Sequence, residues 1–323
     1  MSDPNASIAA AAPETVEKET YLDADLPPQP GSKDRSRSLW SDAWRELRSN
    51  KIFIISAVLI VFFLIMAFFP QVFTFGKDPY TCDLSKSRLP PSSEAWFGYD
   101  INGCDVYTRT IYGAKASIMV GVFATLFTTL LGGFIGTIAG FFGGWTDAIL
   151  SRVTDVFFAI PLLLGGILVL TSFPSGDDTT LYKEVSKVVL ALGILGWTSM
   201  TRIMRSSVIQ VRNADFVVAA RALGAKNSRI IRKHVVPNSL APLIVVATIS
   251  LGGYIGVEAT LSFLGLGLQP PVISWGTMID QAQKFVRVSP HMLFFPAIFL
   301  SVAVLSFIML GDAVREALDP KLR

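Results

Sequence analysis

The sequence predicts an all-α integral membrane protein with six transmembrane helices and a small extracytoplasmic insertion between the first two. Of its 323 residues, 51% are hydrophobic and only 16% are charged, and the mean hydropathy is +0.50. Soluble domains are usually about a quarter charged, so this composition indicates a membrane protein. Six long apolar stretches, and basic residues concentrated in some of the loops between them, indicate the same class.

The first 38 residues are expected to form a disordered cytoplasmic tail. They include Pro27, Pro28 and Pro30 and few large apolar side chains, a composition that cannot bury enough surface to fold. This polar beginning also differs from a cleavable signal peptide, which has a short basic start followed by an apolar core. We therefore expect the tail to carry no chemistry of its own.

Spanning the hydrocarbon of a bilayer takes about 20 apolar residues in helical form. Six stretches meet or nearly meet this length: 52–75, 116–142, 156–173, 188–201, 240–257 and 292–310. Their interiors, with these bounds, contain no Asp, Glu, Lys, Arg or His. Ion-coupled carriers usually place such residues in the membrane, and the chain also has no phosphate-binding loop of the G-x-x-x-x-G-K-[ST] type. If the protein moves a solute, another component must supply the energy.

The loops predict the orientation of these helices. The loop between the fourth and fifth stretches carries one acid, Asp215, and eight cations: Arg202, Arg205, Arg212, Arg221, Lys226, Arg229, Arg232 and Lys233. The stretch before the first span is also basic. Because basic loops stay in the cytoplasm, both termini are expected inside and residues 76–111 outside. Cys82 and Cys104 fall in this outer segment, where the sequence leaves two interpretations open, a disulfide bond or two free thiols.

Glycine and proline residues mark two features within the spans. Gly132, Gly136 and Gly140 recur at four-residue spacing in the second stretch. Small residues at this spacing let helices approach closely in lipid, so we interpret them as packing positions within the bundle and not as a ligand site. Pro161 is expected to kink the third stretch.

The basic loop has a pattern of its own. Phe216, Ala219, Ala220 and Leu223 recur at helical spacing and predict a short amphipathic helix, which Gly224 ends. A second short, basic helix is expected to follow, and Pro237 is expected to end it before the fifth span. The pattern fits a helix lying at the lipid headgroups and equally fits a helix docked in a groove of a cytoplasmic partner.

Two short stretches of this loop resemble a sequence motif of a known family. VAARALGA, Val218 to Ala225, followed by HVVPN, His234 to Asn238, resembles the EAA loop of ABC-transporter permease subunits. Ala219, Ala220, Gly224 and Pro237 match the motif, whereas Val218 stands where the motif has Glu. In the peptide-importing branch of the family that position is often not acidic, so the departure points to this branch.

Three further stretches carry the same resemblance. FGYDINGCDVYTRTIYGAKASIMVG (97–121), EATLSFLGLGLQPPVISWGTMI (258–279) and GDAVREALDPKLR (311–323) are similar to segments of C-type subunits of dipeptide and oligopeptide permeases. In the first of them, Tyr99 and Cys104 replace the family's Thr and Arg, which supports a special pairing of Cys104. The resemblance runs from about Trp40 to the end of the chain.

The resemblance implies a type I ABC importer fold and a specific organisation of the chain. After the tail (1–38) come an amphipathic lead-in with the first transmembrane helix (39–75), the extracytoplasmic segment (76–111), a permease domain (112–312) containing a cytoplasmic coupling loop (202–238), and a cytoplasmic C-terminus (313–323). The implied ATPase-coupling residues are Asp215, Phe216, Val217, Val218, Ala219, Ala220, Arg221, Ala222, Leu223, Gly224 and Ala225. We expect no catalytic, cofactor-binding or metal-binding residue in this chain.

The implied function is ATP-driven import of dipeptides or oligopeptides across the bacterial inner membrane. The expected partners are a B-type permease paralogue, two ABC ATPase subunits that bind ATP and Mg, an extracytoplasmic peptide-binding protein and the lipid bilayer, but no nucleic acid. The same architecture could serve another solute such as nickel or a glycoside. A membrane-embedded enzyme or a channel would need polar constellations or a charged ring within the spans, and neither is visible.

Overall fold

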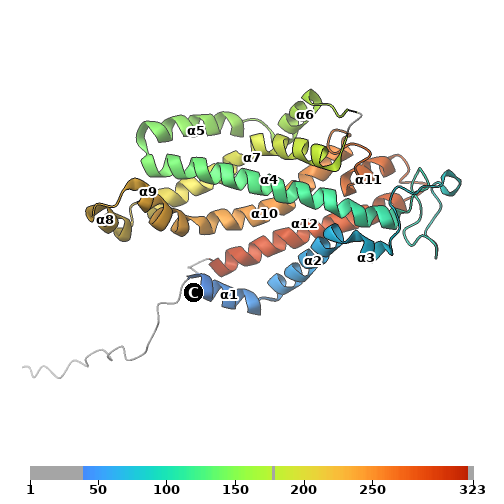
Figure 1. Cartoon of the computed structure of the whole chain (residues 1–323), viewed down its shortest axis with the longest axis horizontal. Coiled ribbons are helices and arrows are strands. Elements are labelled where there is room, and N and C mark those ends of the chain that lie inside the picture. Colours follow the sequence, from blue (N-terminus) through green and yellow to red (C-terminus); the bar gives the residue numbers. More distant parts are fainter. Residues whose placement is uncertain (1–38, 177–178, 319–323) are drawn as a thin grey trace, which may run out of the picture. The chain divides into compact units, whose positions relative to one another are not determined.

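The computed structural model describes residues 39–176 and 179–318, and the predicted tail (1–38) and the last five residues lie outside this part of the chain. The described residues form helices joined by turns and loops (Figure 1). The helices are α1 (Leu39–Ser49), α2 (Lys51–Phe68), α3 (Pro70–Thr74), the 3-10 turn η1 (Leu84–Lys86), α4 (Val106–Phe142), α5 (Gly144–Phe158), α6 (Leu162–Ser172), α7 (Leu181–Val211), α8 (Asp215–Ala222), α9 (Asn227–Ile230), the π-helical turn η2 (Ile231–Val235), α10 (Val236–Phe263), α11 (Trp275–Gln283) and α12 (His291–Leu318).

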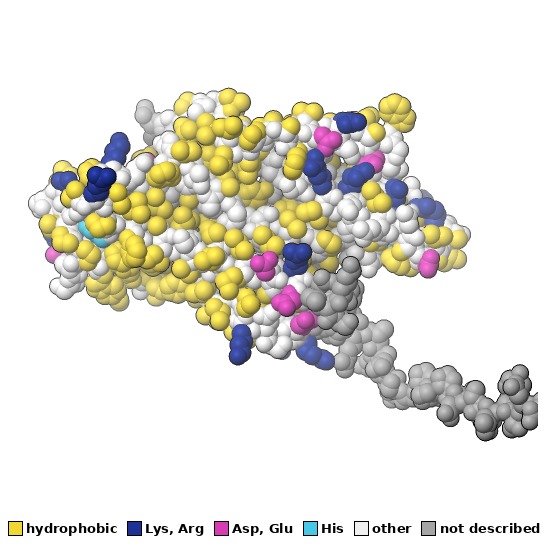
Figure 2. Space-filling model, turned by 180° about the vertical axis from the view of Figure 1, so that it is seen from behind, with side chains coloured by type: hydrophobic (Ala, Val, Ile, Leu, Met, Phe, Trp, Pro, Cys, Tyr) yellow, Lys and Arg dark blue, Asp and Glu magenta, His cyan; other side chains and the backbone are white. Residues whose placement is uncertain are grey.

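Five helical segments in the described part are long and apolar enough to cross a membrane. They are α2, α4, α7, α12 and the continuous run from α9 through η2 to α10. The pair α5 and α6 also passes this test, but the two helices are bent by 81° with respect to each other. With this pair counted as one broken span, the predicted number of six is confirmed. Figure 2 shows hydrophobic side chains over the middle of one face and Lys and Arg gathered toward its ends, as expected for a protein embedded in a bilayer.

Several predicted bounds were wrong because helices continue beyond the apolar stretches that reveal them. The first span ends at Phe68, and Pro70 starts a separate short helix. The second begins ten residues early, at Val106, so its helix includes residues 106–111 of the predicted outer segment. The fourth extends to Val211 and therefore takes up the first ten residues of the predicted coupling loop. Polar residues at helix ends lie beyond the hydrocarbon, where hydropathy cannot detect them.

The third span differs most from its prediction. Its helical structure begins at Gly144, twelve residues before the predicted start, and α5 carries Asp147 and Asp155. Both acids form ion pairs with α7: Arg205 Nη2 donates to Asp147 Oδ2 at 2.7 Å, and Arg202 Nη2 donates to Asp155 Oδ1 at 2.8 Å. The helix α5 ends at Phe158 and α6 begins at Leu162, at an angle of 81° to α5. The kink predicted at Pro161 is therefore confirmed, and it divides the span into two helices.

The glycine stripe of α4 packs against α7. A Cβ atom added to Gly132 would lie 2.5 Å from the carbonyl oxygen of Trp197, and one added to Gly136 would lie 2.6 Å from that of Thr201. At Gly140 the added atom would lie 2.9 Å from the carbonyl oxygen of Arg205. These approaches leave no room for any side chain, so the predicted packing role of the stripe is confirmed.

The fifth span contains an acid that the sequence prediction missed. α10 runs to Phe263, six residues beyond the predicted end, and so includes Glu258, which is fully buried. The absence of ionisable residues therefore holds for the predicted stretch 240–257 but not for the whole of α10. The Glu258 carboxylate accepts hydrogen bonds from Ser262 Oγ at 2.8 Å and from Ser274 Oγ at 3.1 Å.

The segment between α3 and α4 folds around one aspartate. Asp100 Oδ1 accepts hydrogen bonds from the backbone N–H groups of Asn102 and Cys104, and Arg109 pairs with its other oxygen. Cys82 and Cys104 are joined by a disulfide bond, with their Cα atoms 4.2 Å apart. Nearby, the Lys86–Glu94 ion pair raises the pKa of the lysine and lowers the pKa of the glutamate, chiefly through their hydrogen bond.

Candidate coupling and transport sites

The helix α8 lies at the end of the bundle opposite α3 and α11 (Figure 1). Asp215 lies in the first turn of α8 and Arg221 in its last turn. These charges complement the helix dipole and so stabilise this helix of eight residues. Val217 is fully buried and packs with Ile230 and Val235 of the segment that follows. This apolar contact, together with the Phe216 ring, whose centroid lies 6.4 Å from that of His234, holds α8 against the segment that follows it.

The opposite side of α8 is apolar and exposed. Phe216 is 46% exposed and Leu223 is 89% exposed, and Ala219 between them is also exposed. Ala220 is half-buried, and Val218 is exposed on another side of the helix. Apolar side chains of this size, grouped on one face and outside the bundle, are typical of a surface that docks onto another molecule.

Gly224 sets the turn that ends α8. Its φ of +79° lies in the left-handed region, which glycine adopts at little cost. The N–H of Gly224 donates to the carbonyl of Arg221 at 3.0 Å, and the N–H of Ala225 donates to the carbonyl of Ala220 at 3.1 Å. These two bonds form a Schellman motif, which satisfies the last carbonyls of the helix and reverses the chain.

The chain returns to the bundle through one unbroken helical run. Pro237 was expected to end the second short helix, but the helix continues through it. The turn before the proline, η2, is π-helical and has i→i−5 hydrogen bonds. The N–H of Val236 donates to the carbonyl of Ile231, so the lost N–H of the proline leaves the run intact. Arg212, at the start of the loop, donates to the carbonyl of Gly140 at 2.6 Å and so holds the end of α4.

A cavity lies at the break between α5 and α6. Its volume is about 390 Å³, and its walls come from the break itself, from α7 and from α10. Irregular backbone within a membrane is tolerated only where protein covers it or where it borders a cavity, which makes the break the natural place for a passage.

The cavity carries hydroxyl groups and aromatic rings but no charge. Thr198, Ser199, Ser250 and Tyr254 supply its hydroxyl groups, and Phe157 and Phe158 contribute rings. A side chain at Gly196 would collide with the Tyr254 hydroxyl, so this glycine makes room for the tyrosine. An uncharged wall with hydroxyl groups can contact polar backbone groups of a solute without selecting for the charge of its side chains.

The sequence pattern predicted the short helix and its terminal turn but missed the cavity; the coupling role assigned to these residues stays a prediction. All eleven residues from Asp215 to Ala225 lie in α8 and its terminal turn, with Val217 turned inward and Phe216 and Leu223 turned outward. Of the cavity, only Pro161 was singled out in advance. Gly253 and Gly256 in the fifth span were a signal that this helix has an open side, because a Cβ added at either position would meet nothing within 4 Å.

A bundle of membrane-spanning helices with an uncharged cavity at a broken span, and with one amphipathic helix exposed at its end, defines a membrane transport protein. The chain belongs to the family of binding-protein-dependent transport system inner membrane components, whose pattern it matches over residues 132–323. Residues 38–91 match the N-terminal TM domain of oligopeptide transport permease C.

Curated relatives agree over almost the full length. The oligopeptide transport system permease protein OppC of Bacillus subtilis (strain 168) is 41% identical over 90% of this chain and 92% of its own. The dipeptide transport system permease protein DppC of Alkalihalophilus pseudofirmus is 37% identical over 92% of this chain and 94% of its own. The glutathione transport system permease protein GsiD of Pectobacterium atrosepticum is 32% identical over 91% of this chain and 95% of its own.

A solved structure shares the fold. A chain of the MetNI methionine ABC transporter in an inward-facing conformation superposes with a TM-score of 0.51 at 19% sequence identity, covering 64% of this chain and 95% of that one. The predicted type I ABC importer fold and the predicted permease family are thereby confirmed, and the chain is a multi-pass protein of the bacterial inner membrane.

Proposed function

We propose that this chain is one of the two membrane-spanning halves of an ATP-driven importer of dipeptides and oligopeptides. The substrate class is supported by relatives at 41% and 37% identity that are named oligopeptide and dipeptide permeases. The uncharged cavity between α7, α10 and the broken span is consistent with it, because peptides share a backbone but differ in the charge of their side chains. The other half of the passage comes from a B-type permease paralogue.

The observation that carries the coupling role is the exposed Phe216–Leu223 face of α8. In our proposal this face sits in a groove of an ABC ATPase subunit, in the manner of a helix docked by its apolar side. The chain itself is not catalytic and binds no cofactor; two ATPase subunits bind ATP and Mg. Closure of these subunits moves α8, and the movement passes through Val217 into the run from α9 to α10, which borders the cavity.

The proposed orientation places α8 in the cytoplasm and the disulfide-bonded segment outside, where a peptide-binding protein docks. A single cysteine at position 226, introduced as Lys226→Cys into a Cys82→Ser, Cys104→Ser background, tests it, because Lys226 is exposed beside α8. A membrane-impermeant maleimide should label it only from the cytoplasmic side. Labelling of intact cells from outside would reverse the topology.

A pair of matched variants tests the whole proposal. Phe216→Glu puts a charge on the docking face, whereas Val218→Glu puts the same charge two residues away on another exposed side and restores the acid of the family motif. In cells lacking the native chain, wild type and Val218→Glu should restore uptake of labelled dipeptides and oligopeptides, and Phe216→Glu should not, although all three insert in the membrane equally.

Two outcomes would contradict the proposal in different ways. If both Glu variants transport and copurify with ATPase normally, the apolar face lies at lipid headgroups and not in a partner's groove. If the wild-type chain restores uptake of another solute such as nickel or a glycoside but of no peptide, the substrate class is wrong while the coupling role stands.

A further inference from the structure

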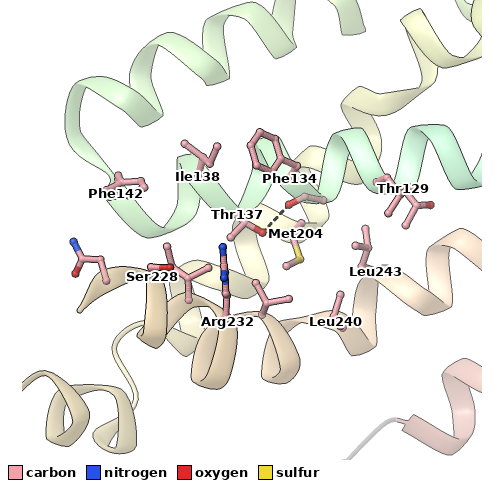
Figure 3. A pocket seen from close by; sticks show the side chains of 15 residues that line it. Thr129, Phe134, Thr137, Ile138, Phe142, Met204, Ser228, Arg232, Leu240 and Leu243 are labelled. Atoms are coloured by element: carbon pink, nitrogen blue, oxygen red, sulfur yellow. Dashed lines mark hydrogen bonds between the residues drawn. The ribbon is translucent and has the colours of Figure 1, made fainter. Parts of the chain in front are cut away.

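A groove runs between α4 and the continuous helical run formed by α9, η2 and α10 (Figure 3). Its volume is about 550 Å³, and fifteen residues line it. The groove shares no lining residue with the cavity at the break between α5 and α6. Neither the proposed coupling face nor the proposed passage therefore accounts for it.

The walls of the groove are apolar along most of its length. Leu130 and Phe134, one turn apart on α4, are 64% and 65% exposed, and Phe142 at the end of the same helix is 55% exposed. Leu240 and Leu243 of α10 form the facing wall. Large apolar side chains left open on membrane-spanning helices contact either lipid chains or another helix, because no water is present at that depth.

One end of the groove is polar and positively charged. Arg232, Ser228 and Asn227 line it where the helical run leaves the basic loop, and the Arg232 side chain points across the groove toward α4 (Figure 3). All three side chains can donate hydrogen bonds. Arg232 is the one charged residue of the lining, and in the described part of the chain no carboxylate lies within ion-pair distance of it.

The length of the groove matches one leaflet of a bilayer. Leu243, at the apolar end, lies eleven positions after Arg232, which corresponds to about 16 Å of helix. Half of the hydrocarbon core of a bilayer is about 15 Å thick. With Arg232 at the membrane surface, the groove therefore reaches to the middle of the membrane, as the acyl chain of a lipid does.

We propose that this groove binds one acyl chain of an anionic phospholipid, with the lipid phosphate held by Arg232. Arg232 has no acidic partner among the described residues and lies at the surface end of an apolar groove one leaflet deep. This arrangement is complementary to a lipid, whose negatively charged headgroup would contact the arginine and whose acyl chain would fill the groove. A helix from a partner protein would fill the apolar part but would have to bring an acid for Arg232.

The bound lipid would contact the segment that carries the coupling helix. Ile231 and Arg232 line the groove, and the neighbouring residues Ile230 and Val235 pack on Val217 of α8. The lipid chain and α8 therefore both contact this short helical segment. An occupied groove would hold α9 and η2 in place and so limit how far α8 can move.

The test uses the full-length chain, with the subunits that copurify with it, in nanodiscs. The nanodiscs contain a trace of either phosphatidylglycerol or phosphatidylcholine, each with a photoreactive diazirine in its acyl chain. Cross-linked peptides are mapped by mass spectrometry. For wild type, phosphatidylglycerol should cross-link to α4 near Phe134 and to α10 near Leu240 more than phosphatidylcholine does. Arg232→Gln should lower the phosphatidylglycerol signal by about tenfold, because one charge-assisted contact is lost.

Two variants make the result specific. Lys233→Gln removes a neighbouring exposed charge that does not line the groove, and it should leave the signal nearly unchanged. Leu240→Trp fills the groove without altering the charge, and it should reduce cross-linking of both lipids. Equal phosphatidylglycerol signals in wild type and Arg232→Gln would overturn the proposal, and so would cross-linking of both lipids only outside the groove residues of α4 and α10.

Discussion

Glu258 and Ser274 are sixteen positions apart in the sequence, yet the Ser274 hydroxyl donates a hydrogen bond of 3.1 Å to the Glu258 carboxylate. Ser274 is also the N-cap of α11, where its Oγ accepts from the backbone N–H of Thr277 at 3.1 Å. The first residue of α11, Trp275, is fully buried and donates from its ring N–H to the carbonyl of Thr110 in α4 at 2.9 Å. Glu258 thus fastens α11 to α10 at the point where α11 meets α4.

The first prediction concerns this carboxylate. Glu258→Ala removes the acceptor of two buried hydroxyl groups, those of Ser262 and Ser274, and should lower the free energy of unfolding by about 1–3 kcal/mol. Glu258→Gln keeps an oxygen at the same place and should lose less. Thermal unfolding in detergent, followed by fluorescence, measures both. Equal losses in the two variants would show that the charge, and not the acceptor, matters here.

The second prediction concerns the contact between α4 and α7. Gly136→Ala adds a methyl group 2.6 Å from the carbonyl oxygen of Thr201 and 2.8 Å from Met204 Cβ, so the helices must separate. We expect a loss of about 1–3 kcal/mol, typical of overpacking. Gly256→Ala is the matched control, because it lies within α10 and an added Cβ there meets nothing within 4 Å. If both variants unfold at the same temperature, the α4–α7 contact is looser than the structure indicates.

The third prediction concerns the turn after α8. Gly224→Val places a β-branched residue at φ +79°, which costs on the order of 1–2 kcal/mol locally and favours a different turn. α8 should then dock poorly, so that ATP hydrolysis continues while solute uptake falls, with normal membrane insertion. Gly224→Asn should retain most of the coupling, since Asn tolerates this conformation better than other residues. Normal uptake by the Val variant would remove Gly224 from the coupling mechanism.

The sequence predicts those features that depend on local pattern and on composition. Apolar length reveals the spans, and the spacing of Phe216 and Leu223 with Gly224 after them reveals α8 and its terminal turn. Hydropathy does not detect the polar ends of helices whose charged side chains form ion pairs with a neighbouring helix. For this reason the predicted third stretch started too late in α5, and the predicted fourth stretch ended too early in α7. Asp155 and Arg202 neutralise each other, and Arg202 also stacks over the Phe158 ring at 3.8 Å. Such partners are known only after folding.

The candidate sites divide in the same way. The docking face lies on one short helix, so its periodicity is visible in the sequence, whereas the cavity and the groove are each assembled from three or more helical segments. Nothing local marks Tyr254 as a neighbour of Gly196, or Arg232 as a residue facing α4. Glu258 was not predicted to lie in a span because the apolar stretch ends at residue 257, whereas the helix α10 continues to Phe263.

The last prediction concerns Cys82 and Cys104. Their disulfide closes a loop of 22 residues, and restricting the unfolded chain in this way stabilises a protein by roughly 3 kcal/mol. The bond lies beside the Arg109–Asp100 ion pair, with Arg109 Nη1 3.4 Å from Cys104 Sγ. In the denatured chain, a maleimide should label neither cysteine until a reductant is added. The Cys82→Ser, Cys104→Ser variant should unfold at a lower temperature, and reductant should shift the wild type toward it but leave the variant unchanged. Full labelling without reductant would mean that the two thiols are free.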